Sequence, residues 1–114
     1  MPREAPDEAA LWDMWRACQR VLQFIAGRSE ADFEEDPFLQ SAVLYQLQTI
    51  GEAARRVSMH YRDAHMDIPW SGVIGQRSVI VHDYGELDLH LIWVAASERV
   101  MLLRDQLAVL LGSA

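Results

Sequence analysis

Apolar residues recur along most of the chain at alternating intervals of four and three positions, which places them on one face of an α-helix. The pattern predicts four long helices, over about 7–26, 37–58, 69–82 and 88–111. The first helix has an apolar line, widened by Trp12, Met14 and Val21, that consists of Leu11, Trp15, Cys18, Leu22 and Ile25. The line of the second helix consists of Val43, Leu47, Ile50, Ala54 and Val57. Such lines are typical of helices that pack antiparallel in a bundle.

Residues at the predicted helix ends agree with these boundaries. Asp36 is suited to cap a helix whose first residue is Pro37. Gly27 and Gly112 follow the first and last helices, where a glycine commonly ends a helix. Each long segment therefore has its own stop or start signal.

Two short helices are predicted between the long ones. Ser29 is followed three residues later by Asp32, a capping pattern that opens a short helical turn. Residues 59–68 have weaker periodicity, which predicts a short helix and a loop. No segment alternates as a β-strand does, so we expect an all-α antiparallel bundle of four main helices plus one or two short helices. At 114 residues it forms a single domain over 1–114, with a flexible tail at 1–6.

Small residues interrupt two of the predicted helices. Gly51 lies inside the second, and Gly72 and Gly75 lie inside the third, at a cost of about 1 kcal/mol each relative to alanine. Close packing, a partner subunit or a ligand is needed to offset that cost. One face of the third helix carries only small residues before its last position, and its residues are Ser71, Gly75, Ser78 and His82. The last helix is apolar nearly all round, which predicts a central position or an oligomer interface.

The net charge of the chain limits the kinds of partner that it can attract. Seventeen acidic and ten basic residues give a net charge of −7, and all the basic residues are arginines. A chain of this charge has no global attraction for nucleic acid, so any RNA binding requires a local basic site or one that an oligomer creates.

The remaining composition favours the cytoplasm. The single cysteine, Cys18, excludes an intrachain disulfide and lies on an apolar helix line, where a small buried residue is expected. No segment approaches the roughly 20 consecutive apolar residues of a membrane span, and the first residues lack the apolar core of a signal peptide. The four histidines show no metal-ligand spacing, so neither a metal nor a cofactor is predicted.

The candidate chemistry lies in residues 76–85. Arg77 carries a permanent charge in a bidentate fork, His82 exchanges a proton near neutral pH, and Tyr84 adds a hydroxyl. Together they are suited to bind a phosphate and to move protons on it without a metal. A structural interpretation stands beside this one. Arg77 on an apolar face is often half of a buried ion pair, and His82 at a helix C-terminus often serves only the helix dipole.

Glu52 has two interpretations. Arg56 follows it by four residues, the favourable order for an ion pair on a helix surface. Alternatively, Glu52 orients Arg77 or His82 from the neighbouring helix.

Three stretches in order resemble one family over nearly the whole chain. They are Ile50-Gly51-Glu52-Ala53-Ala54, then Ile68-Pro69-Trp70 with Ile74-Gly75, and then the Arg-x4-His-x-Tyr signature from Arg77 to Tyr84. In this combination the chain resembles the HepT-like family of minimal HEPN-domain proteins, the toxin halves of HepT/MntA toxin–antitoxin pairs. The resemblance implies a HEPN-type bundle that forms a homodimer, with the paired motifs in a cleft at the two-fold axis.

The resemblance also implies roles for the motif residues. His82 would act as general base or acid on a ribose 2′-hydroxyl, Arg77 would steady the scissile phosphate, and RNA would be the substrate. Tyr84 resembles the residue that a nucleotidyltransferase antitoxin (MntA-like) modifies with AMP, which silences the toxin by charge and bulk. Ser78 stands where the family usually has Asn, Asp or another polar group, and Asp83 adds a negative charge beside the phosphate site.

A second function class remains open. On this alternative the domain is a non-catalytic binding module that forms a complex with a nucleotidyltransferase partner. The two differ in their dependence on Arg77 and His82, because only an enzyme requires them for RNA cleavage.

Overall fold

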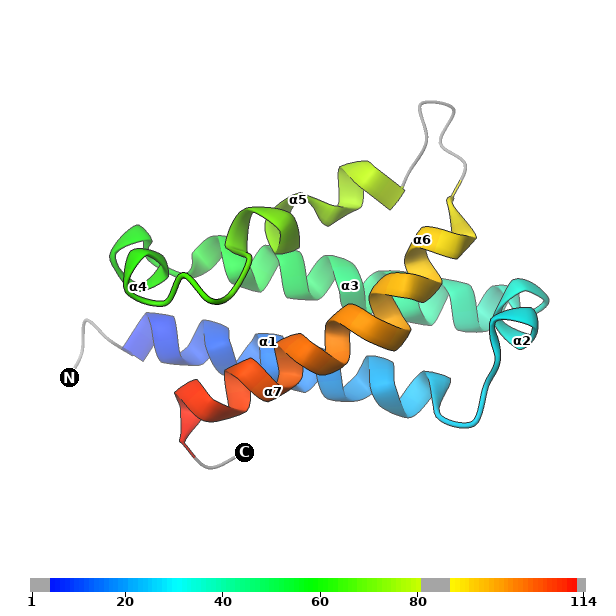
Figure 1. Ribbon diagram of the computed structural model, residues 1–114, viewed down its shortest axis with the longest axis horizontal. Coiled ribbons are helices and arrows are strands. Elements are labelled where there is room, and N and C mark those ends of the chain that lie inside the picture. The colour runs from blue at the N-terminus through cyan, green and yellow to red at the C-terminus, as the bar shows by residue number, and fades with distance from the viewer. Residues whose placement is uncertain (1–4, 81–86, 113–114) are drawn as a thin grey trace.

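A computed structural model describes residues 5–80 and 87–112, with the backbone alone for residue 5 and residues 76–80. The described residues form an all-α bundle without strands, as predicted (Figure 1). The elements are α1 (Ala5–Ile25), α2 (Glu30–Glu34), α3 (Pro37–Arg56), α4 (Met59–Ala64), α5 (Trp70–Ile80), α6 (Leu89–Val94), the π-helical η2 (Ala95–Arg99) and α7 (Val100–Leu111). Helix α3 lies along α1, α5 covers α3, and the helix from α6 to α7 crosses over α1.

The predicted helix caps are confirmed. The Ser29 side chain accepts from the Asp32 N–H at 3.1 Å, and the Asp32 carboxylate accepts from the Ser29 N–H at 2.9 Å. The Asp36 carboxylate accepts from the Leu39 N–H at 3.0 Å. These bonds satisfy backbone donors that have no partner inside the helix. Gly27 and Gly112 end α1 and α7 with φ values of +74° and +78°, a conformation that side chains disfavour.

The core lies between α1, α3 and α7. The predicted line of α3 is confirmed, since all five of its residues are buried. In α1 the predicted line is rotated, because Met14 and Val21 are fully buried while Trp15 and Leu22 are only partly buried. Helix α1 packs against α3 and α7 at once, so a wider stripe is buried than one line can supply.

Cys18 is buried as predicted, and burial raises the pKa of its thiol to about 12.

The last helix differs from the prediction of one regular helix. Residues Ala95–Arg99 form a π-helical segment, and the Ser97 hydroxyl donates to the Trp93 carbonyl at 2.7 Å. The buried residues Ile92, Ala96 and Val100 follow one another at intervals of four, and in a regular α-helix each would be rotated by about 40° from the one before. The wider π turn between Ala95 and Arg99 reduces this rotation.

Helix α7 remains incompletely covered. Its large apolar residues Met101, Leu102 and Val109 are exposed, Val109 to 80%. The expectation of a central helix is therefore wrong for this face, and the alternative of an oligomer interface stays open. None of the described helices is long and apolar enough to cross a bilayer.

Helix α2 is attached to α6 by an aromatic contact and an ion pair. The rings of Phe33 and Trp93 lie 5.5 Å apart, and His90 Nδ1 lies 2.9 Å from the Glu30 carboxylate. Hydrogen bonding to Glu30, followed by its charge, raises the pKa of His90 above 6.5, and the nearby Asp88 and Glu34 carboxylates act in the same direction.

The His90–Glu30 pair predicts a pH-dependent stability. Because the folded pKa of His90 is raised, its contribution is complete below the unfolded value near 6.5 and is lost as pH rises through the folded value. We expect the urea midpoint of the wild type, relative to His90→Gln, to rise between about pH 8 and about pH 6. Glu30→Gln should remove the same pH-dependent rise in the urea midpoint. An unchanged difference between wild type and both variants across this range would show that the pair contributes no stability.

Candidate functional site

The helix that carries the motif, α5, rests on α3 through a close backbone contact. A Cβ atom placed on Gly51 would lie 3.3 Å from the Val73 carbonyl oxygen and 3.6 Å from that of Ile74. This distance is tighter than most Cβ contacts, so Gly51 allows the two backbones to approach. The prediction of a close approach at Gly51 is confirmed.

The glycines of α5 itself are different. A Cβ on Gly72 would meet only the Pro69 Cβ at 4.0 Å, and one on Gly75 would meet no atom within 4 Å in the part of the chain that the structure describes. Packing against the described residues therefore does not account for the glycine at position 72. The other expectations, a partner subunit or a ligand, remain open for it.

The N-terminal end of α5 is firmly anchored. Ile68 and Trp70 are buried, and the Trp70 indole N–H donates to the His65 carbonyl at 2.9 Å. The Pro69 carbonyl accepts from the Val73 N–H at 2.9 Å, so Pro69 directly precedes the helix that begins at Trp70. The helix is thereby fixed in position relative to α3 before it reaches the motif.

The motif residues themselves fall mostly outside this description. The backbone of Arg77 and Ser78 lies in the last turns of α5, and their side chains are not described. His82, Asp83 and Tyr84 lie outside the described residues. Their grouping around a phosphate stays a prediction.

The expected ion pair of Glu52 with Arg56 is wrong. Arg56 instead binds Asp13 of α1 at 2.8 Å, and Glu52 is exposed without an ion-pair partner among the described residues. Helix α1 lies beside the C-terminal half of α3 and offers a carboxylate that also accepts from Arg16. The bond from Arg56 is the main cause that lowers the pKa of Asp13. The other interpretation of Glu52, as a residue that orients Arg77 or His82, is untested.

Two histidines, one within α4 and one directly after its last residue, line a separate cavity. Asp7, Glu8, His60 and His65 are among the residues around a cavity of about 450 Å³ between α1, α4 and α7. The His65 ring stacks on Tyr61 with centroids 4.3 Å apart. Within 5–80 and 87–112, no three His, Cys, Asp or Glu side chains are placed to hold one metal ion.

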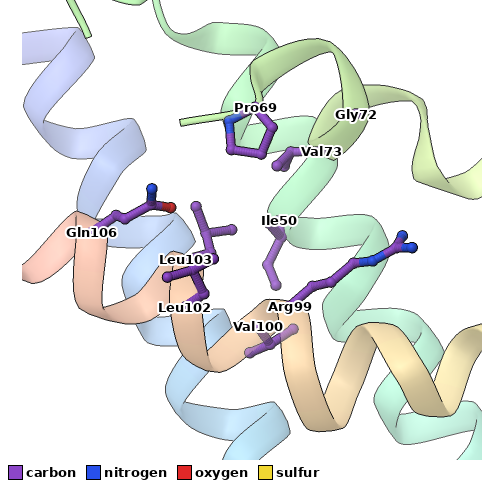
Figure 2. A pocket seen from close by; sticks show the side chains of 9 residues that line it. All are labelled: Ile50, Pro69, Gly72, Val73, Arg99, Val100, Leu102, Leu103 and Gln106. Atoms are coloured by element: carbon purple, nitrogen blue, oxygen red, sulfur yellow. The ribbon is translucent and has the colours of Figure 1, made fainter. Parts of the chain in front are cut away.

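A second cavity, of about 240 Å³, was not predicted. It lies between α3, α5 and α7, as Figure 2 shows, and most of its walls are apolar. Its polar lining residues are Arg99 and Gln106. The available signal was a line at intervals of three and four residues that begins at Arg99, the last residue of η2, and continues in α7 with Leu102, Gln106 and Val109. The apolar character of the helix on nearly all sides obscured it.

Comparison with known proteins identifies the class of protein. The profile of the family described as ribonuclease HepT-like matches residues 14–110, from α1 to α7. This range covers most of the chain and includes the whole Arg-x4-His-x-Tyr signature. The chain belongs to the HepT-like ribonuclease family.

Individual relatives are similar over most of their length. A protein of Caldanaerobacter subterraneus subsp. tengcongensis, named as a candidate RNase, is 29% identical over 94 residues, which cover 82% of this chain and 84% of the relative. Another candidate RNase, from Methanocaldococcus jannaschii, is 26% identical over 90% of this chain and 94% of its own. A Thermococcus cleftensis protein named "Probable ribonuclease HepT" is 27% identical over 84% of this chain and 87% of its own length. No solved structure matches the chain significantly.

Proposed function

We propose that this chain is a metal-independent endoribonuclease, the toxin of a toxin–antitoxin pair that acts in the cytoplasm. The observation that carries the proposal is the match to the ribonuclease HepT-like family over 14–110, a range that includes Arg77, His82 and Tyr84. Relatives named as ribonucleases support it.

The proposed chemistry uses the 2′-hydroxyl of RNA as the nucleophile. His82 takes the proton from this hydroxyl, the 2′-oxygen bonds to the adjacent phosphorus, and the bond between phosphorus and the 5′-oxygen breaks. The leaving 5′-oxygen takes a proton from water. Arg77 binds the non-bridging phosphate oxygens, where negative charge grows in the transition state. The products are a 2′,3′-cyclic phosphate and a 5′-hydroxyl.

A homodimer is part of the proposal. With a net charge of −7, one chain offers RNA little attraction, whereas two copies of Arg77 in one cleft concentrate positive charge. Glu52, Ser78 and Asp83 would adjoin the cleft.

Silencing by a nucleotidyltransferase antitoxin completes the proposal. The Tyr84 hydroxyl would attack the α-phosphorus of ATP, forming a phosphodiester to AMP and releasing pyrophosphate. The added negative charge and bulk, two residues from His82, would repel and block the RNA phosphate.

The test is RNA cleavage by the purified protein in excess EDTA, beside DNA of the same sequence. We expect cleavage of RNA alone, unaffected by EDTA, with cyclic phosphate ends by mass spectrometry. Intact mass first establishes that Tyr84 carries no AMP. An unmodified protein that leaves a broad set of RNAs uncut would contradict the enzyme and favour a binding module.

A further inference from the structure

The unpredicted cavity between α3, α5 and α7 has a polar group at each end. Arg99 and Gln106 lie seven residues apart on one helix, which corresponds to about 10 Å along its axis. Figure 2 shows them at opposite ends of the cavity, with apolar side chains between them. The walls in between include Ile50, Val73 and Leu103, one from each of the three helices. A ligand in this space is therefore held by polar groups only at its two ends.

Gln106 presents an unused acceptor. Its side-chain nitrogen donates to the Asp67 carbonyl at 2.9 Å, and because a carbonyl only accepts, this bond fixes the orientation of the amide. The remaining atom, Oε1, is buried and has no hydrogen-bond partner in the described part of the chain. A buried acceptor without a partner costs about 1–3 kcal/mol, so a ligand that donates an N–H here is favoured.

Arg99 presents an unused cation. It is exposed, and no carboxylate among the described residues lies within ion-pair distance of it. By contrast, Arg16, Arg28, Arg56 and Arg104 each have an aspartate as partner. A cation beside an apolar wall favours an anionic group on the ligand, most strongly a carboxylate that accepts from its planar fork.

We propose that this cavity binds a small aromatic carboxylate that carries an N–H donor, of the indole-alkanoate class. The ring fills the apolar middle, the N–H donates to Gln106 Oε1, and the carboxylate accepts from Arg99. A volume of about 240 Å³ lies below the range of roughly 300–1,000 Å³ for drug-sized ligands, which suits one fused ring system with a short chain. This site is separate from the proposed RNA cleavage and does not depend on it.

A ligand here would connect α5 to α7. Pro69, Gly72 and Val73 of α5 form one wall, and residues of α7 form the other. Because Arg77 lies on α5, occupancy of the cavity would steady the helix that carries the motif.

The experiment is a calorimetric titration of the wild-type protein with indole-3-butyrate. Arg99→Gln should weaken binding about tenfold or more, because it removes a charge-assisted bond. Arg20→Gln is the matched control, since Arg20 is an exposed arginine on α1 without an ion pair in the described part of the chain, and its affinity should equal that of the wild type. The N-methylated indole probe, which lacks the donor, should bind the wild type about fivefold more weakly.

Three outcomes would overturn the proposal. The first is an absence of saturable binding by the wild type at millimolar probe. The second is equal affinity in Arg99→Gln and Arg20→Gln, which would indicate apolar adsorption elsewhere. The third is binding of a helical peptide with a tryptophan and a glutamate when the free probe does not bind, which would make the cavity a protein-docking site instead.

Discussion

Replacement of His82 by alanine should lower the rate of RNA cleavage by about 10²–10⁴-fold, the contribution of a positioned general acid or base. The 2′-hydroxyl is a weak acid, so without a base its oxygen is seldom nucleophilic. We expect folding to be unchanged, because the substitution alters none of the residues that form the described core between α1, α3 and α7. The measurement is single-turnover cleavage of a labelled RNA, with circular dichroism to establish the fold.

Matched variants separate the catalytic role from a general effect of losing a histidine. His60→Ala removes an exposed histidine on α4 and should leave cleavage unchanged. Arg77→Lys keeps the charge but loses the bidentate fork, so it should fall between the wild type and Arg77→Ala. Equal cleavage by wild type and His82→Ala would place the activity elsewhere or in a contaminant.

Replacement of Gly51 by leucine should destabilise the protein by about 2–3 kcal/mol, as overpacking does in a close contact. Even the Cβ would lie 3.3 Å from the Val73 carbonyl oxygen, and a backbone atom yields less readily than a side chain. The substitution would push α5 away from α3. Since a displacement of about 1 Å can cost 10²-fold in rate, cleavage should fall by a similar factor. Urea unfolding and single-turnover cleavage measure the two effects.

Gly72→Leu is the control for this substitution. It makes the same change inside a helix of the same pair, but a Cβ there meets only the Pro69 Cβ at 4.0 Å. Its stability should be unchanged or higher by up to about 1 kcal/mol, since leucine favours a helix more than glycine does. A similar loss of stability in both variants would mean that backbone conformation, and not the contact with α5, governs the position of Gly51.

Local signals in the sequence were sufficient for much of the fold. The caps at Ser29 and Asp36 depend on residues three positions away, so they can be predicted directly from the sequence. The π-helical segment at Ala95–Arg99 depends on how this part of the last helix packs against α1, and periodicity along one helix does not contain that information. The rotated face of α1 has the same cause.

The candidate site likewise has features that the sequence predicts and features that only the packing of the helices determines. Arg77, His82 and Tyr84 are close in sequence, so their spacing and the resemblance identified the family that the profile match then established. Arg56 forms its ion pair with Asp13, 43 residues away, and not with Glu52 on its own helix. This pairing depends on the packing of α1 against α3, which the sequence alone does not show. The cavity with Arg99 and Gln106 likewise requires α3, α5 and α7 together.

The buried thiol of Cys18 makes the chain a reporter of its own opening. Thiolate is the form that alkylating reagents attack, and a pKa of about 12 leaves almost none of it near neutral pH, quite apart from the surrounding core that excludes the reagent. Because the sequence contains no other cysteine, each alkylated molecule records one excursion in which α1 left the core. The kinetics of labelling would therefore measure how often the native bundle opens, without any introduced probe.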